Sequence, residues 1–235
     1  MHKLKLLPIH GLIILATILA YSVVARLFSI SAMTNTIKNR TCFVIDAGHG
    51  GIDGGAVSCT GITESELNLE IALRLNDFMR IIGLETTMIR TEDTSVYTEG
   101  NTIASQKASD LKERVRIVNE NDNSVLLSVH QNHFSDSKYY GGQIFYAANP
   151  ESQTLAAILQ ENWNCYLTPD TNRQHKKAEG IYLIKHIENP GVLIECGFLS
   201  NYQEEAKLRT TTYQQKICGV IAKSCIEFLN RKGIS

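Results

Sequence analysis

The stretch Cys42-Phe-Val-Ile-Asp46 is followed directly by Ala47-Gly-His-Gly-Gly-Ile-Asp-Gly-Gly55. A short apolar run of this kind predicts a buried β-strand, and the glycines after it predict a loop that begins where the strand ends. In α/β sheets the ends of strands carry the chemistry. The loop is therefore a candidate functional site, and His49 is the reactive side chain inside it.

Helices and strands alternate along the chain that follows. The apolar pattern predicts strands over 84–90, 125–129, 143–147, 181–184 and 192–195, and helices over 63–83, 109–118, 151–166 and 213–231. Thr63 and the glutamate three residues later have the spacing of a capping box. Ser109 or Asp110 is expected to cap the next helix, after a polar loop over 93–108. This alternation predicts one α/β domain over residues 41–233, with helices on both faces of its sheet.

Residues 1–32 differ from the rest of the chain. Lys3 and Lys5 precede an apolar run from Gly11 to Ala25. Such a segment indicates either an export signal or an uncleaved membrane anchor, and its length, near the roughly 20 residues of a spanning helix, leaves both open. In either case we expect the domain to work outside the cytoplasmic membrane, and to be attached to the membrane if the segment is not cleaved.

The charge composition indicates which classes of binding partner the protein is unsuited to. The net charge is −1, and 20% of the residues are charged, without a long basic or acidic block. This argues against a nucleic-acid partner. The six cysteines include no Cys-x-x-Cys pair, and the sequence supports no disulfide assignment.

Three side chains suited to a zinc ion stand beside predicted strand or helix ends. His49 follows the first strand, His130 follows the strand over 125–129, and Glu64 lies in the first turn of the helix after the glycine loop. Two histidines and one carboxylate form a known catalytic zinc set, which leaves the fourth position for water. Glu195 ends a strand that is apolar on both faces, where a carboxylate needs a partner or a metal nearby. It is a candidate general base.

Taken singly, each of these residues has a plainer interpretation. A lone histidine after a strand is more often structural, Glu64 would be stabilised by the helix dipole, and Glu195 could pair with an arginine. The loop does not match two phosphate-binding patterns. The third glycine of a dinucleotide motif would fall at Asp53, and the Gly-Lys-Ser/Thr of a P-loop is absent.

Together, four segments resemble the signature blocks of one family. They are Val44–Ala56, Gly61–Leu69, Ser128–Asn132 and Val192–Asn201. They look like the zinc-dependent N-acetylmuramoyl-L-alanine amidases that cut cell-wall peptidoglycan, and the resemblance covers about residues 42–230. It implies a mixed, twisted β-sheet flanked by helices and a bound Zn²⁺. It also implies that His49, Glu64 and His130 are the zinc ligands and Glu195 is the catalytic glutamate.

The family resemblance implies a substrate and a reaction. The substrate would be a peptidoglycan glycan strand with its stem peptide, and the bond cut would join the lactyl group of N-acetylmuramic acid to L-alanine. The chain departs from the family pattern at Ala47, often Pro, at Cys196, often a small residue, and at Asn132-His133. None of these departures removes a metal donor.

A narrower resemblance points to spore-cortex amidases of endospore-forming bacteria. It rests on the single N-terminal apolar segment, on the absence of wall-binding repeats, and on Ser109–Val115 and Gly180–His186. It implies action between the forespore membranes, before muramic-δ-lactam forms. Whether a protein activator is needed stays open.

Other residues near the expected site have supporting interpretations. Asp46 and Asn132 are expected to orient the ligating imidazoles, with a strand-end cap as an equal alternative for Asp46. His133 is either a substrate contact or a solvated loop residue. The loop over 50–61, through Asp53 and Ser58, is expected to line the groove for the glycan strand.

Three rival functions remain compatible with this pattern. One is a zinc endopeptidase that cuts within the stem peptide. The second is a peptidoglycan-binding protein that has lost its activity. The third is a wall protein that needs a partner to complete its site.

Overall fold

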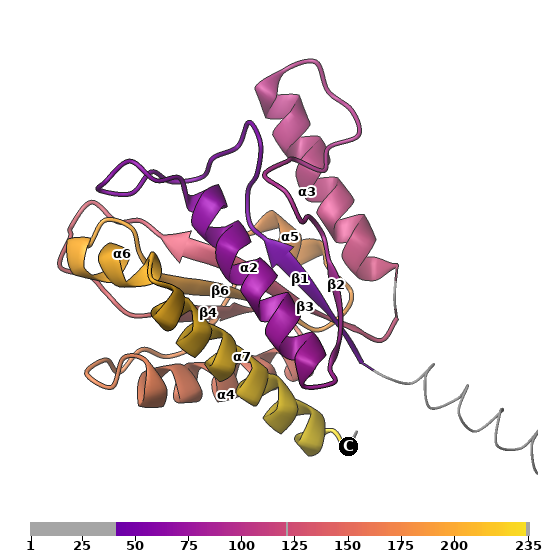
Figure 1. Ribbon diagram of the computed structural model, residues 1–235. Coiled ribbons are helices and arrows are strands. Elements are labelled where there is room, and N and C mark those ends of the chain that lie inside the picture. Colours follow the sequence, from indigo (N-terminus) through magenta and orange to yellow (C-terminus); the bar gives the residue numbers. More distant parts are fainter. Residues whose placement is uncertain (1–40, 121, 234–235) are drawn as a thin grey trace, which may run out of the picture. The chain divides into compact units, whose positions relative to one another are not determined.

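The computed structural model describes residues 41–120 and 122–233 (Figure 1). The strands are β1 (Cys42–Ala47), β2 (Glu85–Met88), β3 (Ser124–Asn132), β4 (Gln143–Tyr146), β5 (Lys176–Lys177) and β6 (Gly191–Phe198). The helices are α2 (Glu64–Ile81), α3 (Ile103–Asn119), α4 (Pro150–Tyr166), α5 (Tyr182–His186), α6 (Tyr202–Leu208) and α7 (Thr211–Arg231). The signal or anchor expected over residues 1–32 lies outside the described residues. Within the described ranges, no helix combines the length and apolarity that crossing a bilayer requires.

The strands form one mixed sheet in the order β2-β1-β3-β6-β4-β5. β1 runs parallel to β2 and β3, and β3 runs parallel to β6. β4 is antiparallel to β6, and the short β5 is parallel to β4. Parallel neighbours need long crossovers, which α2 and α3 supply between β1, β2 and β3. The predicted mixed α/β sheet is confirmed.

Each face of the sheet has its own apolar cluster. Phe43 and Ile45 belong to the cluster that α2, α4 and α7 cover, whereas Val44 belongs to the cluster under α3 and α5. Neighbouring residues of a strand point to opposite faces, so the continuous apolar run of β1 fits burial on both sides. The expectation of helices on both faces is confirmed (Figure 1).

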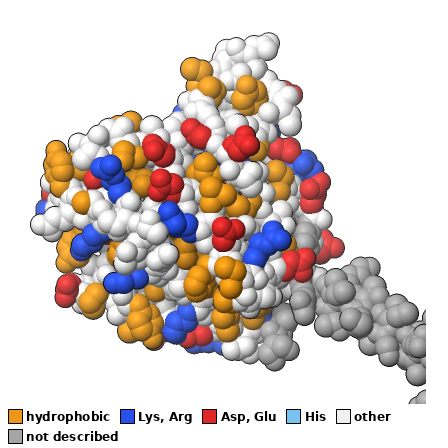
Figure 2. All heavy atoms as spheres, viewed as in Figure 1, with side chains coloured by type: hydrophobic (Ala, Val, Ile, Leu, Met, Phe, Trp, Pro, Cys, Tyr) orange, Lys and Arg blue, Asp and Glu red, His pale blue; other side chains and the backbone are white. Residues whose placement is uncertain are grey.

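The outer surface carries charges of both signs. Figure 2, viewed from the side of α2 and α7, shows acidic and basic side chains interspersed among separate apolar patches. This agrees with the net charge of −1. All six cysteines fall in the described ranges and are free thiols.

The strand predicted over 181–184 is wrong, because this segment forms α5. Leu183 and Ile184, which are adjacent, are both buried under α3, and Ile187 joins them one turn later. A short apolar run does not distinguish a strand from one helical turn by its periodicity.

A second difference from the sequence prediction concerns the start of α3. The helix begins at Ile103, where Thr102 accepts a hydrogen bond from the Ser105 backbone and forms a capping box. Ser109 and Asp110 lie inside the helix and stabilise the loop before it instead. The Ser109 hydroxyl accepts the backbone N–H of Thr98, and the Asp110 carboxylate accepts that of Val96. At α2 the helix starts where predicted, but the Thr63 side chain makes no capping hydrogen bond.

The two ends of the domain are set by its topology. α7 starts beside α6, which follows the carboxyl end of β6, and its 21 residues span about 30 Å back along the sheet. β1 starts at the amino edge of the sheet. The start of β1 and the end of α7 therefore lie at the end of the domain opposite the loops that follow β1 and β3 (Figure 1).

Candidate metal centre

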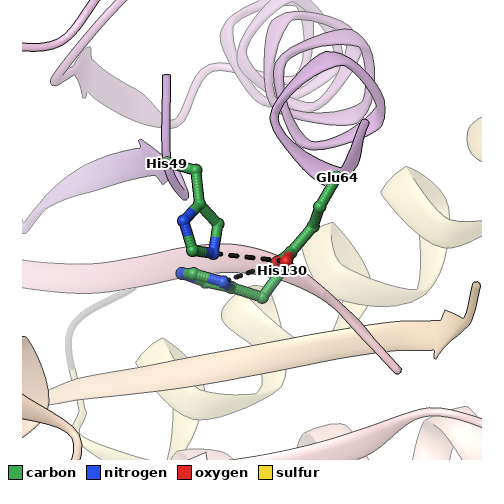
Figure 3. Close-up of side chains that lie close together, drawn as sticks. All are labelled: His49, Glu64 and His130. Atoms are coloured by element: carbon green, nitrogen blue, oxygen red, sulfur yellow. Dashed lines mark hydrogen bonds and ion pairs between the residues drawn. The ribbon is translucent and has the colours of Figure 1, made fainter. Parts of the chain in front are cut away.

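Three side chains from three separate elements meet at the carboxyl edge of the sheet (Figure 3). His49 comes from the loop after β1, Glu64 is the first residue of α2, and His130 lies near the end of β3. One donor atom from each lies within 4.8 Å of the other two. Two imidazoles and a carboxylate at this separation can hold one divalent cation.

Glu64 is the centre of this group. Its carboxylate lies 3.2 Å from Nε2 of His49 and 2.9 Å from Nδ1 of His130. It also accepts the backbone N–H groups of Ala56 at 3.0 Å and Gln131 at 3.1 Å. Burial alone would raise the pKa of Glu64, but the two histidines outweigh it and hold that pKa far below its usual range. The carboxylate is therefore ionised and fixed in place.

The glycines let the backbone come close to these side chains. A Cβ on Gly48 would lie 2.2 Å from Nε2 of His130, and one on Gly55 would lie 2.6 Å from Oε2 of Glu64. Both approaches are too short for any side chain. His49 itself has a φ of 62°, which is uncommon for a residue other than glycine and points to a constrained loop.

The His49 ring is oriented by a residue that the sequence did not single out for this role. Nδ1 of His49 lies 2.9 Å from Oδ2 of Asp53, and the other oxygen of Asp53 lies 2.7 Å from the Lys107 amine on α3. Burial lowers the pKa of His49, but Glu64 and Asp53 outweigh it and raise that pKa to about 9. The sequence signal that could have identified Asp53 is a carboxylate four residues after a histidine.

Asp46, expected to orient an imidazole, contacts other groups. Its buried carboxylate pairs with the Arg114 guanidinium and accepts the Ser128 hydroxyl at 2.6 Å. Arg114 also donates to Asp110 at 2.6 Å and to the backbone oxygen of His49 at 2.6 Å. A buried guanidinium needs several acceptors, and Asp46 is one of them. Through Arg114, the Asp46 end of β1 supports the backbone of the glycine loop.

We predict that Arg114→Met destabilises the domain by about 3–5 kcal/mol, because it leaves Asp46 and Asp110 buried beside each other without their cation. Urea unfolding measures this change. The matched control is Arg116→Met on the same helix, where an exposed guanidinium pairs with Glu113 and Glu120, and we expect less than about 1 kcal/mol. Equal losses in the two variants would contradict the role assigned to Arg114.

Glu195 lies beside this group on the neighbouring strand. It pairs in register with His130, and the two residues face the same side of the sheet as Leu193. Its Oε2 is buried and has no hydrogen-bond partner among the described residues. Burial raises the pKa of Glu195 to about 7. A buried carboxyl group without a partner, next to potential metal donors, is typical of a functional site.

The remaining predicted residues lie around the edge of the site. Asn132 lines a depression with Phe134 and Phe198, and His133 is exposed. Ser58 is buried and donates to Glu205 of α6 at 3.4 Å, so it does not face an open groove. This contact connects the segment that follows the glycine loop to α6.

Comparison with known proteins places this arrangement in context. The sequence model of a family described as N-acetylmuramoyl-L-alanine amidase matches residues 43–227. The germination-specific N-acetylmuramoyl-L-alanine amidase of Bacillus subtilis (strain 168) is 36% identical over 191 residues, which is 80% of this chain and 80% of the relative. The amidase LytC of the same organism is 30% identical over 201 residues, which is 83% of this chain and 37% of LytC.

Solved structures share the fold. The CwlD amidase from Clostridioides difficile, determined in complex with the GerS lipoprotein, superposes with a TM-score of 0.78 and is 36% identical. The match covers 82% of this chain and 100% of that one. An N-acetylmuramoyl-L-alanine amidase from Clostridium difficile 630 gives a TM-score of 0.72 at 28% identity, over 83% of this chain and 100% of the other.

Proposed function

The chain belongs to the N-acetylmuramoyl-L-alanine amidase family, and from that premise we propose that it is a zinc hydrolase acting on spore-cortex peptidoglycan, with Glu195 as its catalytic base. Its activity is hydrolysis of the amide bond between the lactyl group of N-acetylmuramic acid and the L-alanine of the stem peptide. The substrate is therefore a cell-wall polymer.

The donor set fits zinc. His49, Glu64 and His130 would hold the ion, since two imidazoles and one carboxylate are a ligand set that zinc takes in hydrolytic sites. When bound, zinc supplies a positive charge that acidifies water and polarises a carbonyl oxygen. The hydrogen bonds to Glu64 and His49 keep both side chains oriented before any ion arrives.

The catalytic step depends on Glu195. Its unpaired Oε2 takes a proton from the attacking water and returns it to the alanine nitrogen as that nitrogen leaves. Burial raises the pKa of this carboxyl group, which favours its taking up the proton in the first half of the transfer. The observation that carries the proposal is this buried, unpaired oxygen in register with a histidine of the metal centre.

The cortex assignment draws on the relatives. One similar protein is named a germination-specific amidase. A similar structure holds CwlD together with the GerS lipoprotein, which supports the proposal that a protein partner also binds this chain. We propose that the domain works outside the cytoplasmic membrane, in the cortex between the forespore membranes.

We predict that the purified domain digests spore peptidoglycan to peptide-free glycan and to free stem peptides that begin at alanine. Mass spectrometry of the products measures this outcome. An endopeptidase would instead leave alanine on the glycan and release fragments from within the stem peptide. Vegetative-wall peptidoglycan is the matched substrate, and equal rates on both walls would argue against the cortex preference. No release of alanyl peptides from either wall, with or without added wall lipoproteins, would overturn the proposed activity.

A further inference from the structure

Two depressions of different chemistry flank the metal centre. The first, here called the leucine recess, is lined by Leu111, Leu183 and Leu193, with Lys107 and the two histidines of the metal centre in its wall. Its volume is about 180 Å³. His49 and His130 belong both to the recess and to the metal centre. The recess therefore opens directly onto the metal centre, on the side of α3 and α5.

The second depression, here called the aromatic depression, lies farther along the same edge. Phe134, Tyr139 and Phe198 line it together with Asn132 and Arg173, and its volume is about 270 Å³. Asn132 pairs with Phe198 on the neighbouring strand, just beyond the pair of His130 and Glu195. The register shifts between these two pairs, and Asn132 lies two residues after His130, so the aromatic depression adjoins the end of the strand that carries His130.

The rings in the aromatic depression are held as a platform. Tyr139 stacks on Phe198 at 6.3 Å and meets the edge of Phe134 at 5.1 Å, while the Arg173 guanidinium lies 4.9 Å from the Phe198 ring. Phe134 is 51% exposed and Tyr139 is 39% exposed. The Lys138 amine lies 5.2 Å from the centre of the Tyr139 ring. Exposed aromatic side chains next to amide, amine and guanidinium donors suit a sugar ring, whose C–H face packs on a ring and whose hydroxyl groups accept hydrogen bonds from the donors.

The leucine recess has the opposite character. Its leucines provide a small apolar floor that fits a methyl group. Two cations and three carboxylates line it. Arg114 is buried and paired with Asp46 and Asp110, and the third carboxylate is that of Asp53. The Lys107 side chain is 47% exposed, and its one ion-pair partner among residues 41–120 and 122–233 is Asp53. This leaves its amine able to meet a carboxylate at the mouth of the recess.

We infer that the substrate crosses the site in one direction, with the muramic acid ring on the aromatic depression and the alanine methyl group in the leucine recess. The α-carboxylate of the glutamate that follows alanine then meets Lys107. This inference rests on the proposed function and adds to it the direction in which the substrate lies across the site. It also assigns Asp53, expected to line the glycan groove, to the peptide side of the site.

The glycan side is tested by binding a peptide-free tetrasaccharide of peptidoglycan to the zinc-loaded domain, measured by calorimetry. We expect Phe134→Ala and Tyr139→Ala each to weaken this binding by about threefold to tenfold. Tyr166→Ala, which removes an exposed tyrosine of α4 outside both depressions, is the control and is expected to leave binding unchanged. Neither glycan-side variant should alter binding of the dipeptide L-alanyl-D-glutamate.

The peptide side is tested with that dipeptide and with its analogue in which the α-carboxylate of glutamate is an amide. We expect Lys107→Met to weaken binding of the carboxylate form by about threefold and to leave the amide form unchanged. Lys112→Met, an exposed lysine on the same helix, is the control. Zinc content of each variant is measured alongside, because Lys107 also contacts Asp53.

The outcomes separate clearly. Loss of dipeptide binding in the aromatic variants, equal loss of both dipeptides in Lys107→Met, or no binding of either probe to the wild type would overturn the inferred direction. These are binding measurements, so they do not depend on turnover. If the domain binds both probes as expected but releases no alanyl peptide, the proposed activity is wrong, and the inferred direction of the substrate across the site still holds.

Discussion

Replacing Glu195 with glutamine is expected to lower kcat by about 10²–10⁴-fold, because an amide cannot take the proton that the buried Oε2 is placed to accept. Glutamine has nearly the same shape as glutamate and fits the same space on β6. Glu195 is also not one of the three residues of the donor group. We therefore expect the variant to keep its zinc and its thermal stability while it loses turnover.

Release of alanyl peptides from cortex fragments measures the loss, and elemental analysis measures the bound zinc. Glu161→Gln, which changes an exposed glutamate on α4, is the control and is expected to turn over at the wild-type rate. Near wild-type activity in Glu195→Gln would remove this residue from the mechanism. Loss of zinc along with activity would make it a part of the metal centre instead.

Removal of the metal is expected to lower activity at least as much as Glu195→Gln does. A chelator should reduce activity to the uncatalysed background, and added zinc should restore it. His130→Ala should weaken zinc binding by more than about 100-fold, because it removes a ligand and also frees one side of Glu64.

His133→Ala is the matched control, since His133 lies three residues further along the same segment and is exposed. We expect its zinc affinity, measured by competition with a chromogenic chelator, to stay within about twofold of the wild type, as for most surface substitutions. A comparable loss of affinity in both variants would contradict the assignment of His130 as a ligand.

The fold was largely predictable because long elements repeat their apolar residues over several turns or strand positions. α7 and α4 were expected within two residues of their observed bounds. Short elements were not predictable in the same way. α6, with 7 residues, was missed although Asn201 caps it by accepting the N–H groups of Gln203 and Glu204. An asparagine followed by two acidic residues was the signal that could have found it.

In the candidate site, sequence reasoning found the residues whose types are chemically unusual for their positions. It did not find the residues that hold these side chains in place. The contact of Asp53 with His49 depends on a loop conformation in which His49 has a φ of 62°, and no local pattern specifies that angle. The pair of Asp46 and Arg114 joins residues 68 positions apart, on a strand and a helix whose relative placement only the folded sheet decides.

The positions of the start of β1 and the end of α7 have a practical consequence. β1 starts and α7 ends at the side of the domain away from the metal centre (Figure 1). A fluorescent label, an affinity handle or an immobilising linker joined after Arg231 would project away from an insoluble murein sacculus while the opposite edge engages it. The domain is therefore suited to oriented attachment on a sensor surface, with its metal centre left accessible to fragments of the polymer.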